Sequence, residues 1–159
     1  MPPYRFRSMS EADLPMVRNW LATPHVAEWW HDAEQFEFVS GDLDHHDMAQ
    51  FIVTLEERPL GYLQCYRMSE WHDGFGLQPP GTRGLDQFIG EHDMIGRGHG
   101  SALIRTFAEE LLNSGTPRII LDPNPANARA IRAYEKAGFV RDREVSTPDG
   151  PALLMVRNA

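Results

Sequence analysis

A glycine-rich turn past the middle of the chain has the residue types and spacing of an anion-binding site. In Gly96-Arg97-Gly98-His99-Gly100 the glycines alternate with larger residues. Glycine has no Cβ, so several successive backbone N–H groups of such a turn can point into one concavity. A predicted helix follows directly, and its unpaired N–H groups and positive dipole end face the same place. The turn therefore predicts binding of an anionic group with Arg97 at its rim. The alternative is a plain connection from a strand to a helix.

Two well-known phosphate-binding loops do not fit this turn. The P-loop requires Lys-Ser or Lys-Thr after its last glycine, and no such pair follows Gly100. The Rossmann fingerprint requires its third glycine one residue later and near the start of a βαβ unit, whereas this turn follows several apparently antiparallel strands. The anion therefore belongs to another class of binding loop.

Composition and net charge narrow the class of partner. The chain has 159 residues, enough for one domain with a buried core, and its formal net charge is −8. Because nucleic-acid binding needs a basic face, we expect no nucleic-acid partner. The charge is compatible with a cationic substrate, and equally with the mild acidity that aids solubility. No apolar stretch is long enough to cross a bilayer, so we expect no membrane partner.

Cysteine and histidine usage favours neither disulfide nor metal chemistry. The one cysteine, Cys65, cannot form an internal disulfide and is interpreted as a small buried residue of a strand. The N-terminus carries no apolar run typical of a signal peptide, so we predict a cytoplasmic location. The seven histidines show no metal-ligand spacing. We interpret His45-His46-Asp47 as a solvated loop segment and expect no metal.

The start of the chain predicts a strand and a helix. Alternation of apolar and polar residues favours a strand over Tyr4–Met9. Ser10 and Asp13 resemble a capping box at the start of a helix, which Pro24 closes. Residues 31–47 carry little pattern and are interpreted as a polar, mobile connection.

Three further strands are predicted before the glycine turn. Ala49–Leu55 and Leu60–Arg67 form a predicted hairpin, and Thr82–Ile89 leads toward the turn, with Gly84 as a predicted bulge. Residues 68–81 form a long loop, and a loop of that length in a compact domain is more often functional than idle.

After the turn, helices and strands alternate. Ser101–Asn113 has an apolar stripe at helical spacing, and Asn127 caps a helix that runs to Ala137 and ends at Gly138. Strands are predicted over Arg118–Asp122, Phe139–Ser146 and Ala152–Arg157. The order indicates an α/β fold, a mixed sheet with helices on both faces.

Two segments resemble motifs of the GNAT superfamily of N-acetyltransferases. Ile95–Leu103 is similar to the superfamily's acetyl-CoA pyrophosphate loop, Asn127–Phe139 is similar to its more specific downstream motif, and their separation also fits. The superfamily loop opens with Arg or Gln where this chain has Ile95, a tolerable departure because backbone amides do most of the binding there. The resemblance implies an α/β (α+β) fold, with a mostly antiparallel central sheet, as one domain over residues 1–159.

Further segments look like the aminoglycoside 6′-N-acetyltransferases: Glu28–Trp30, Gly61–Tyr66, Arg83–Gly90, Asp122–Asn127 and Thr147–Ala152. The resemblance covers most of the chain from about residue 20 onward. It is poorest at 31–48 and 68–80, which are expected to contact substrate. The hydroxylysine acetyltransferases of siderophore synthesis share the general pattern, but usually carry His where this chain has Asp86.

The resemblance implies roles for particular residues. Asp86 is predicted to orient or deprotonate the acceptor amine, Asp122 to bind a second ammonium, and Tyr134 to act as general acid toward the coenzyme sulfur. Helical periodicity also places Tyr134 in the core, and the two readings agree because a half-buried tyrosine needs a polar partner. The alternative for each aspartate is a strand-end residue making turn hydrogen bonds. The predicted acceptor pocket also comprises Gln64, Tyr66, Trp29, Trp30 and Trp71.

The predicted cofactor site comprises Phe88, Ile89, Ile95, Gly96, Arg97, Gly98, His99, Gly100, Ser101, Asn127, Arg129, Ala130 and Tyr134. His99 is expected to face solvent or phosphate. For Trp29 and Trp30 the alternative is packing against the first helix.

The sequence therefore predicts an acetyl-CoA-dependent N-acetyltransferase acting by direct transfer in a ternary complex. The predicted acceptor is a primary amine of a cationic amino sugar, the 6′-amine of aminoglycosides. Another polyamine or a hydroxylysine/siderophore-type metabolite is the alternative acceptor. An acyl-CoA-binding sensor without turnover is the non-enzymatic alternative, and the presence of Asp86 and Tyr134 counts against it. A monomer and a homodimer are both compatible with the sequence.

Overall fold

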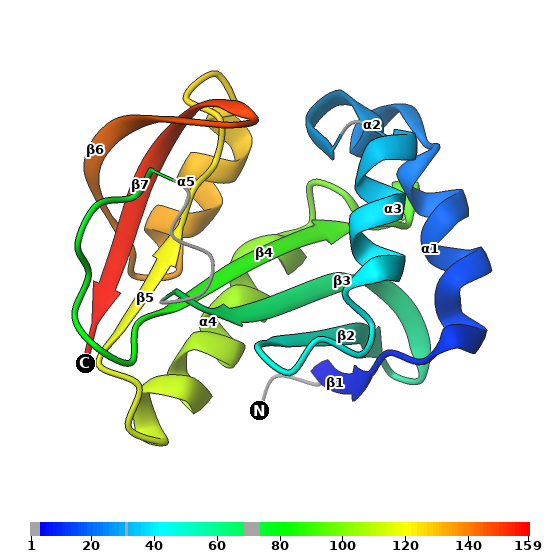
Figure 1. The fold of residues 1–159 in the computed structure, drawn as a ribbon. Helices are drawn as coiled ribbons and strands as arrows, with labels where there is room; N and C mark the ends of the chain where they lie inside the picture. The colour runs from blue at the N-terminus through cyan, green and yellow to red at the C-terminus, as the bar shows by residue number, and fades with distance from the viewer. Residues whose placement is uncertain (1–3, 31, 69–73) are drawn as a thin grey trace.

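In residues 4–30, 32–68 and 74–159, which the computed structural model describes, seven strands form one mixed sheet (Figure 1). Its spatial order is β1-β2-β3-β4-β5-β7-β6. The β4–β5 pair is parallel and the other pairs are antiparallel. The strands are β1 Tyr4–Ser8, β2 Met48–Leu55, β3 Arg58–Arg67, β4 Arg83–Ile89, β5 Arg118–Leu121, β6 Val140–Thr147 and β7 Gly150–Asn158.

Helices cover both faces of this sheet, as predicted (Figure 1). On one face, α1, α2 and α3 pack with the inward side chains of β2, β3 and β4, among them Ile52, Tyr62 and Phe88. On the other face, α4 and α5 pack on the side chains that alternate with these, among them Val53 and Leu63. The helices are α1 Leu14–Leu21, α2 Pro24–Trp30, α3 Asp32–Gly41, α4 His99–Asn113 and α5 Ala128–Lys136, with short 3-10 helices at Glu11–Asp13 and His92–Met94.

The one parallel pair is short, and this shapes the site. Strands β4 and β5 pair only at Arg83↔Ile119 and Gly84↔Ile120. Beyond these residues the two strands diverge (Figure 1). Successive side chains of a strand point to opposite faces. Phe88 belongs to the core beneath α1–α3, so Gly84 and Asp86 face the same side. Leu85 belongs to the core beneath α4 and α5, so Gln87 and Ile89 face that side.

Several local predictions are confirmed. The Ser10 backbone N–H donates to the Asp13 carboxylate at 2.9 Å, so the first helical segment begins with the predicted capping box. The β2–β3 hairpin turns at Glu56 and Glu57, which adopt positive φ angles of 50° and 71°. Asn127 caps α5, since its side chain accepts a hydrogen bond from the Ala130 N–H at 3.2 Å.

Three local predictions are wrong. Pro24 begins α2 rather than only closing the preceding helix, because the missing N–H of proline is not needed in the first turn of a helix. Residues 32–41 of the supposed polar connection form α3, where Val39 is buried and Arg18 lies over the Phe36 ring. Gly84 is not a bulge: a Cβ there would overlap the Tyr66 ring, so glycine permits close packing.

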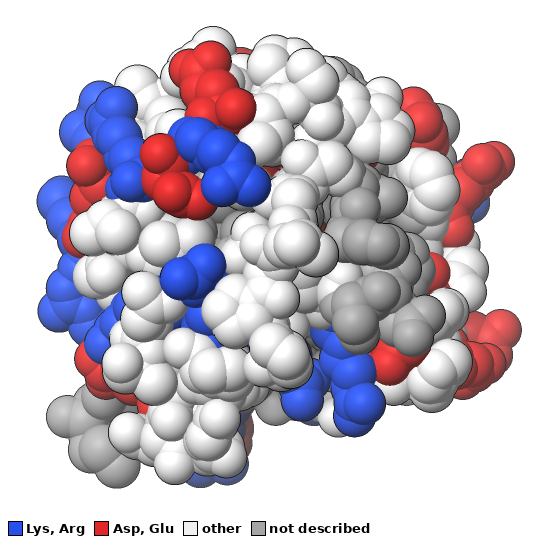
Figure 2. Space-filling view, turned by 60° about the vertical axis from the view of Figure 1, so that its left-hand side comes forward, with Lys and Arg blue, Asp and Glu red and all other residues white. Residues whose placement is uncertain are grey.

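The described part of the long loop packs against the C-terminal strands. Phe75 is buried with Tyr66 and Ile120, and Arg143 of β6 donates to the Phe75 carbonyl at 2.7 Å. On the face that presents these C-terminal strands, Lys and Arg side chains lie beside Asp and Glu side chains (Figure 2). Ion pairs join Arg141 of β6 to Glu135 of α5 and Arg157 of β7 to Glu109 of α4. Among the helices described, none combines the length and apolar character required to span a bilayer.

Candidate active site

The divergence of β4 and β5 opens into a cavity of about 960 Å³. Helices α2 and α3 line it on one side, and the first turn of α4, helix α5 and the turn between β6 and β7 line it on the other. The two cores that position these elements are separate, one on each face of the sheet. The cavity therefore joins the two faces where the sheet has no strand pairing.

Two aspartates lie where the strands separate. Asp86 is on β4, two residues beyond the last paired residue, and Asp122 directly follows β5, two residues beyond Ile120. Their carboxyl groups are close enough to share a proton. Strand alternation sends both side chains to the same face, so divergence of the backbone leaves a space that both carboxyl groups enter.

Hydrogen bonds fix the orientation of the Asp86 carboxylate. Gln64, its cross-strand neighbour on β3, donates from Nε2 to Asp86 Oδ2 at 2.8 Å. The Tyr62 hydroxyl donates to Gln64 Oε1 at 2.7 Å. Gln50 Nε2 donates in turn to the Tyr62 oxygen at 3.0 Å and to the Val39 carbonyl at 2.8 Å. This chain of donors holds Oδ2 of the Asp86 carboxylate.

Burial and mutual repulsion govern the protonation of the pair. Burial raises the pKa of Asp86, while hydrogen bonds from Gln64 and Asp122 oppose that rise. Burial and then the charge of Asp86 raise the pKa of Asp122 well above its usual range. Two carboxylates this close do not both ionise readily, so the pair retains one proton at a higher pH than a single aspartate would. With one proton bound, the pair offers one carboxylate that can accept a proton or bind a cation.

Tyr134 lies on the α5 side of the same cavity. It is part of the main core and only 7% exposed, yet its side chain also lines the cavity. Burial raises its pKa, partly opposed by a hydrogen bond from Gln87. The phenol is therefore protonated at neutral pH and can donate a proton but not accept one.

The glycine turn presents unpaired backbone donors at the start of α4. Gly96 and Gly98 have φ angles of 75° and 81°, in the left-handed region that favours glycine. Gly98 is the N-cap, and no side chain caps the helix. The first backbone hydrogen bond of the helix runs from the Ala102 N–H to the Gly98 carbonyl, which leaves the N–H groups of the first turn available to an anion.

The structure brings nearly all predicted site residues to this one cavity. Asp86, Tyr134, Asp122, Gln64, Tyr66, Trp29 and Trp30 line it, as do Phe88, Ile89, Ile95, Gly96, Gly98, His99, Gly100, Ser101, Asn127, Arg129 and Ala130. Arg97 does not line it and is exposed. Trp71 lies outside the described residues.

Two side chains have partners that the sequence did not indicate. His99 was expected to face solvent or phosphate, but its Nδ1 lies 2.6 Å from the Tyr4 hydroxyl, so β1 supports the glycine turn. Trp30 lines the cavity and also packs edge-on against Tyr62 and Phe88, so it contributes to the core between α2 and the sheet. Packing and cavity lining thus coexist at this tryptophan.

Sequence reasoning missed several polar residues of the cavity. Glu28, Gln35 and Asp42 line it from α2, α3 and the turn after α3, and Asp149 lines it from the turn between β6 and β7. Asp42 and Gln35 fall in the segment interpreted as a mobile connection, so no pattern marked them. Asp149 had a weak signal, because it is a carboxylate in a turn that resembles a family motif.

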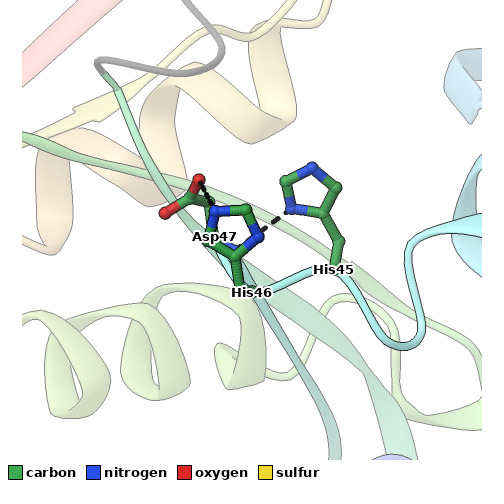
Figure 3. A group of neighbouring side chains, drawn as sticks. All are labelled: His45, His46 and Asp47. Carbon is green, nitrogen blue, oxygen red and sulfur yellow. Dashed lines mark hydrogen bonds and ion pairs between the residues drawn. The ribbon is translucent and has the colours of Figure 1, made fainter.

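His45, His46 and Asp47, none of which lines the cavity, form a local cluster (Figure 3). The expectation of a solvated segment is wrong for Asp47, which is 5% exposed. Its Oδ2 lies 2.9 Å from His46 Nε2, its N–H donates to His45 Nδ1 at 3.1 Å, and Arg67 Nε lies 3.6 Å from Oδ1. The cluster joins the turn before β2 to the end of β3, and its role is a structural one.

Comparison with known proteins gives one family match. The model of the acetyltransferase (GNAT) domain matches residues 9–147. The chain is 39% identical over 162 aligned residues to the aminoglycoside N(6')-acetyltransferase type 1 of Klebsiella pneumoniae, covering 95% of this chain and 81% of that protein. It is 28% identical over 153 residues to the lysine N-acyltransferase MbtK of Mycobacterium tuberculosis, covering 86% and 69%.

Solved structures agree with the sequence comparison. The crystal structure of the aminoglycoside acetyltransferase AAC(6')-Ib in complex with coenzyme A and kanamycin superposes with a TM-score of 0.86 at 39% identity. That match covers 98% of this chain and 94% of the other. The cavity, the aspartate pair and the glycine turn therefore lie on a fold known to hold a coenzyme and an amino sugar together.

Proposed function

The chain belongs to the GNAT family of acetyltransferases, and from this we propose that it transfers the acetyl group of acetyl-CoA to a primary amine of an aminoglycoside, at the 6′ position. The observation that carries the proposal is the Asp86–Asp122 pair where β4 and β5 separate, facing the same cavity as the glycine turn. The aspartate pair suits a protonated amine, and the glycine turn suits an anion.

The glycine turn fits the pyrophosphate of acetyl-CoA. A Cβ added at Gly96 or Gly98 would meet nothing within 4 Å, so the glycines serve backbone conformation and leave open space. Residues 99–101 would hold the anion through their N–H groups. Acetyl-CoA supplies the acetyl group as a thioester. Apart from Arg97, the remaining predicted cofactor residues, among them Ile89 and Asn127, line the same cavity.

Asp86 acts as the base for the acceptor. An alkyl ammonium is mostly protonated near neutral pH, so a carboxylate must take a proton before the nitrogen can attack. The Gln64 hydrogen bond holds one oxygen of Asp86 and directs the other toward the amine. Burial raises the pKa of Asp86, which makes it a stronger base than a surface aspartate.

Tyr134 supplies the proton that the leaving sulfur requires. The amine nitrogen bonds to the carbonyl carbon, the carbon–sulfur bond breaks, and the electron pair stays on sulfur, which takes the Tyr134 hydroxyl proton. The phenolate regains a proton from the nitrogen, which must lose one to become an amide, and Asp86 passes its own proton to solvent. Together the steps release one proton for each ammonium acetylated.

The remaining acidic side chains suit a substrate with several ammonium groups. Asp122, Asp149, Asp42 and Glu28 line the cavity at different elements, so one polycation can contact more than one of them. Ammonium binding at Asp122 replaces the proton that it shares with Asp86. Aromatic faces beside these carboxylates suit sugar rings and cations. We propose Tyr66, Trp29, Trp30 and Gln64 for this acceptor site, with Trp71 retained from the sequence prediction.

A steady-state assay of CoA release tests the proposal. Kanamycin is compared with a matched aminoglycoside that carries a hydroxyl in place of the 6′-amine, and turnover is expected only with the amine. Equal rates on both would exclude the 6′ position. Turnover of hydroxylysine or a polyamine without turnover of any aminoglycoside would identify a metabolite enzyme. Thermal stabilisation by acetyl-CoA with no CoA release from any amine would identify a sensor.

Residues 1–159 are proposed to form one acetyltransferase domain, supported by the family match over 9–147 and by the single sheet. A cytoplasmic location is proposed because acetyl-CoA is a cytoplasmic metabolite and the single cysteine forms no internal disulfide.

A further inference from the structure

His25, the second residue of α2, lines the cavity and takes part in none of the roles above. Its Nε2 lies 2.9 Å from the carbonyl oxygen of Ile89, the last residue of β4. A carbonyl oxygen can only accept a hydrogen bond, so Nε2 is the ring nitrogen that carries the proton and donates it. The other ring nitrogen, Nδ1, is buried and has no partner within the described part of the chain. The Ile89 carbonyl is therefore the group that the His25 ring holds.

The Ile89 carbonyl needs such a partner because it points to the side of β4 where the neighbouring strand has ended its pairing. In an antiparallel pair, opposed residues alternate between exchanging two hydrogen bonds and exchanging none. Gly90 donates to the Leu60 carbonyl at 2.9 Å, so the residue before it, Ile89, points its N–H and C=O away from β3. On that other side the last pair with β5 is at Gly84. Both backbone groups of Ile89 therefore face the gap between β4 and β5, where Ile89 lines the cavity.

The surroundings of His25 fix this end of the strand. A Cβ added at Gly90 would overlap the Trp20 ring, so glycine lets α1 pack directly on the end of β4. The His25 ring meets the His92 ring edge-on, with 5.5 Å between their centroids. His92 begins the 3-10 helix that leads to the glycine turn. His25 thus connects α2, the end of β4 and the approach to the glycine turn.

The geometry matters because the transfer step needs a donor that neither Asp86 nor Tyr134 supplies. When the amine nitrogen adds to the thioester carbon, the carbonyl oxygen gains negative charge, and that charge returns to the carbon–oxygen bond when the carbon–sulfur bond breaks. A donor aimed in advance at this oxygen lowers the barrier. The Ile89 N–H points into the gap from the same residue as the carbonyl that His25 holds. Holding the carbonyl fixes the backbone of Ile89, and with it the direction of the N–H.

We propose that His25 is a positioning residue for acetyl transfer: by donating to the Ile89 carbonyl, it aims the Ile89 N–H at the thioester oxygen of acetyl-CoA. The inference rests on the proposed function, because the thioester belongs to the acetyl donor. It adds a link between α2, which lines the acceptor side of the cavity, and the strand that faces the cofactor.

Substitution of His25 separates the hydrogen bond from the packing of the ring. His25→Phe keeps a ring and removes the donor, whereas His25→Gln places an amide N–H at a similar reach. Loss of an oxyanion donor costs roughly 10²–10³-fold in kcat, so misdirecting one is expected to cost about tenfold in His25→Phe. His25→Gln is expected to stay within about threefold of the wild-type kcat, and the Kd for acetyl-CoA within about twofold in both variants, the pattern of a group needed in the transition state.

His92→Phe is the matched control, because His92 is exposed, does not line the cavity and can keep its edge-on ring contact as phenylalanine. Its kcat is expected to equal that of the wild type. A wild-type kcat in His25→Phe, or an equal loss in His25→Gln or His92→Phe, would overturn the positioning role. His25→Asn, whose shorter side chain leaves the donor out of reach, replaces His25→Phe if the phenylalanine variant does not fold.

The infrared carbonyl band of bound acetyl-CoA tests the same contact without turnover. A hydrogen bond lowers the stretching frequency of a carbonyl, so acetyl-CoA labelled at the acetyl carbonyl is expected to absorb at a lower frequency when bound than when free. In His25→Phe the band is expected to move back toward the free value, and in His25→Gln to stay at the wild-type position. An identical band in wild type and His25→Phe refutes the role of His25. Failure of every amine to release CoA refutes the proposed function instead, while the band still reports on Ile89.

Discussion

Replacement of Asp86 by Asn is the sharpest test of the proposed chemistry. Asparagine has the shape of aspartate, and its Oδ1 can still accept the hydrogen bond that Gln64 Nε2 donates at 2.8 Å. The side chain therefore keeps its position on β4 but cannot take a proton from an ammonium. The glycine turn at the start of α4 is untouched, so the binding of acetyl-CoA has no reason to change.

The expected size of the effect follows from the role of a base. General base catalysis contributes roughly 10²–10⁴-fold to a rate. We expect kcat to fall about 100-fold, which corresponds to about 2.7 kcal/mol of transition-state stabilisation. The Kd for acetyl-CoA is expected to change less than twofold. A loss of kcat with intact cofactor affinity is the signature of a group needed in the transition state only.

The pH profile gives an independent readout. The base must be ionised, so activity falls as the pH drops through the pKa of Asp86. Burial raises this pKa, which places the acid limb of kcat/KM above the usual aspartate range. In Asp86→Asn that limb is expected to disappear from the residual activity.

The assay is CoA release followed with a thiol reagent, together with calorimetric titration of acetyl-CoA. Asp44→Asn provides a matched control, because Asp44 is an exposed aspartate that does not line the cavity. A kcat within threefold of the wild-type value, or an acid limb that persists in Asp86→Asn, would refute the assignment of Asp86 as base.

Two further predictions follow from the same geometry. Asp122→Asn is expected to flatten the dependence of Tm on pH. Because the pKa of Asp122 is raised in the folded protein, its contribution to stability is greatest below the unfolded pKa and is lost as pH rises through the folded pKa. The variant should therefore gain most in Tm at pH 8, about 2–4 °C for each ~1 kcal/mol, and parallel Tm curves of variant and wild type from pH 5 to pH 9 would contradict this. Gly98→Ala places a Cβ on a residue whose φ is 81°, which costs about 1–2 kcal/mol of backbone strain, and is expected to raise the Kd for acetyl-CoA at least fivefold by calorimetry. Gly115→Ala is the control, because Gly115 also has a positive φ, 107°, but lies beyond the other end of α4, and it is expected to leave this Kd unchanged.

The sequence predicted the second half of the fold better than the first. The elements after the glycine turn carry strong periodicity, and α4 and α5 and the last strands lie within a few residues of the predicted positions. In α3 only Phe36 and Val39 of the described residues mark an inward side, and one turn of apolar spacing does not separate a helix from a loop. The prediction at Pro24 was incomplete for a related reason, since a proline can follow the end of one helix and also begin the next.

Site residues that belong to a sequence motif could be predicted, whereas site residues that only the packing of the fold brings to the cavity could not. Asp86, Asp122, Tyr134 and the glycines belong to motifs, and they meet in one cavity. Gln87 belongs to the same strand motif as Asp86, yet nothing in the sequence says that its amide nitrogen lies beside Gly100. Asp42 comes from a segment without any pattern.

The feature that organises the site is the short contact between β4 and β5, and it has no local sequence signal. Two pairs of residues hold the strands together, and at Gly84 the Tyr66 ring takes the place that a side chain would fill. Had the pairing continued, Asp86 and Asp122 would lie in a closed sheet, two carboxyl groups without solvent or substrate to satisfy them, at a large cost in free energy. The same two residues become useful because the strands separate at that point. Their alternation directs both to the amine side, and it directs Gln87, one residue further along β4, to the side of Tyr134. A single interruption of the ladder thus brings the aspartate pair, Tyr134 and the glycine turn to one cavity.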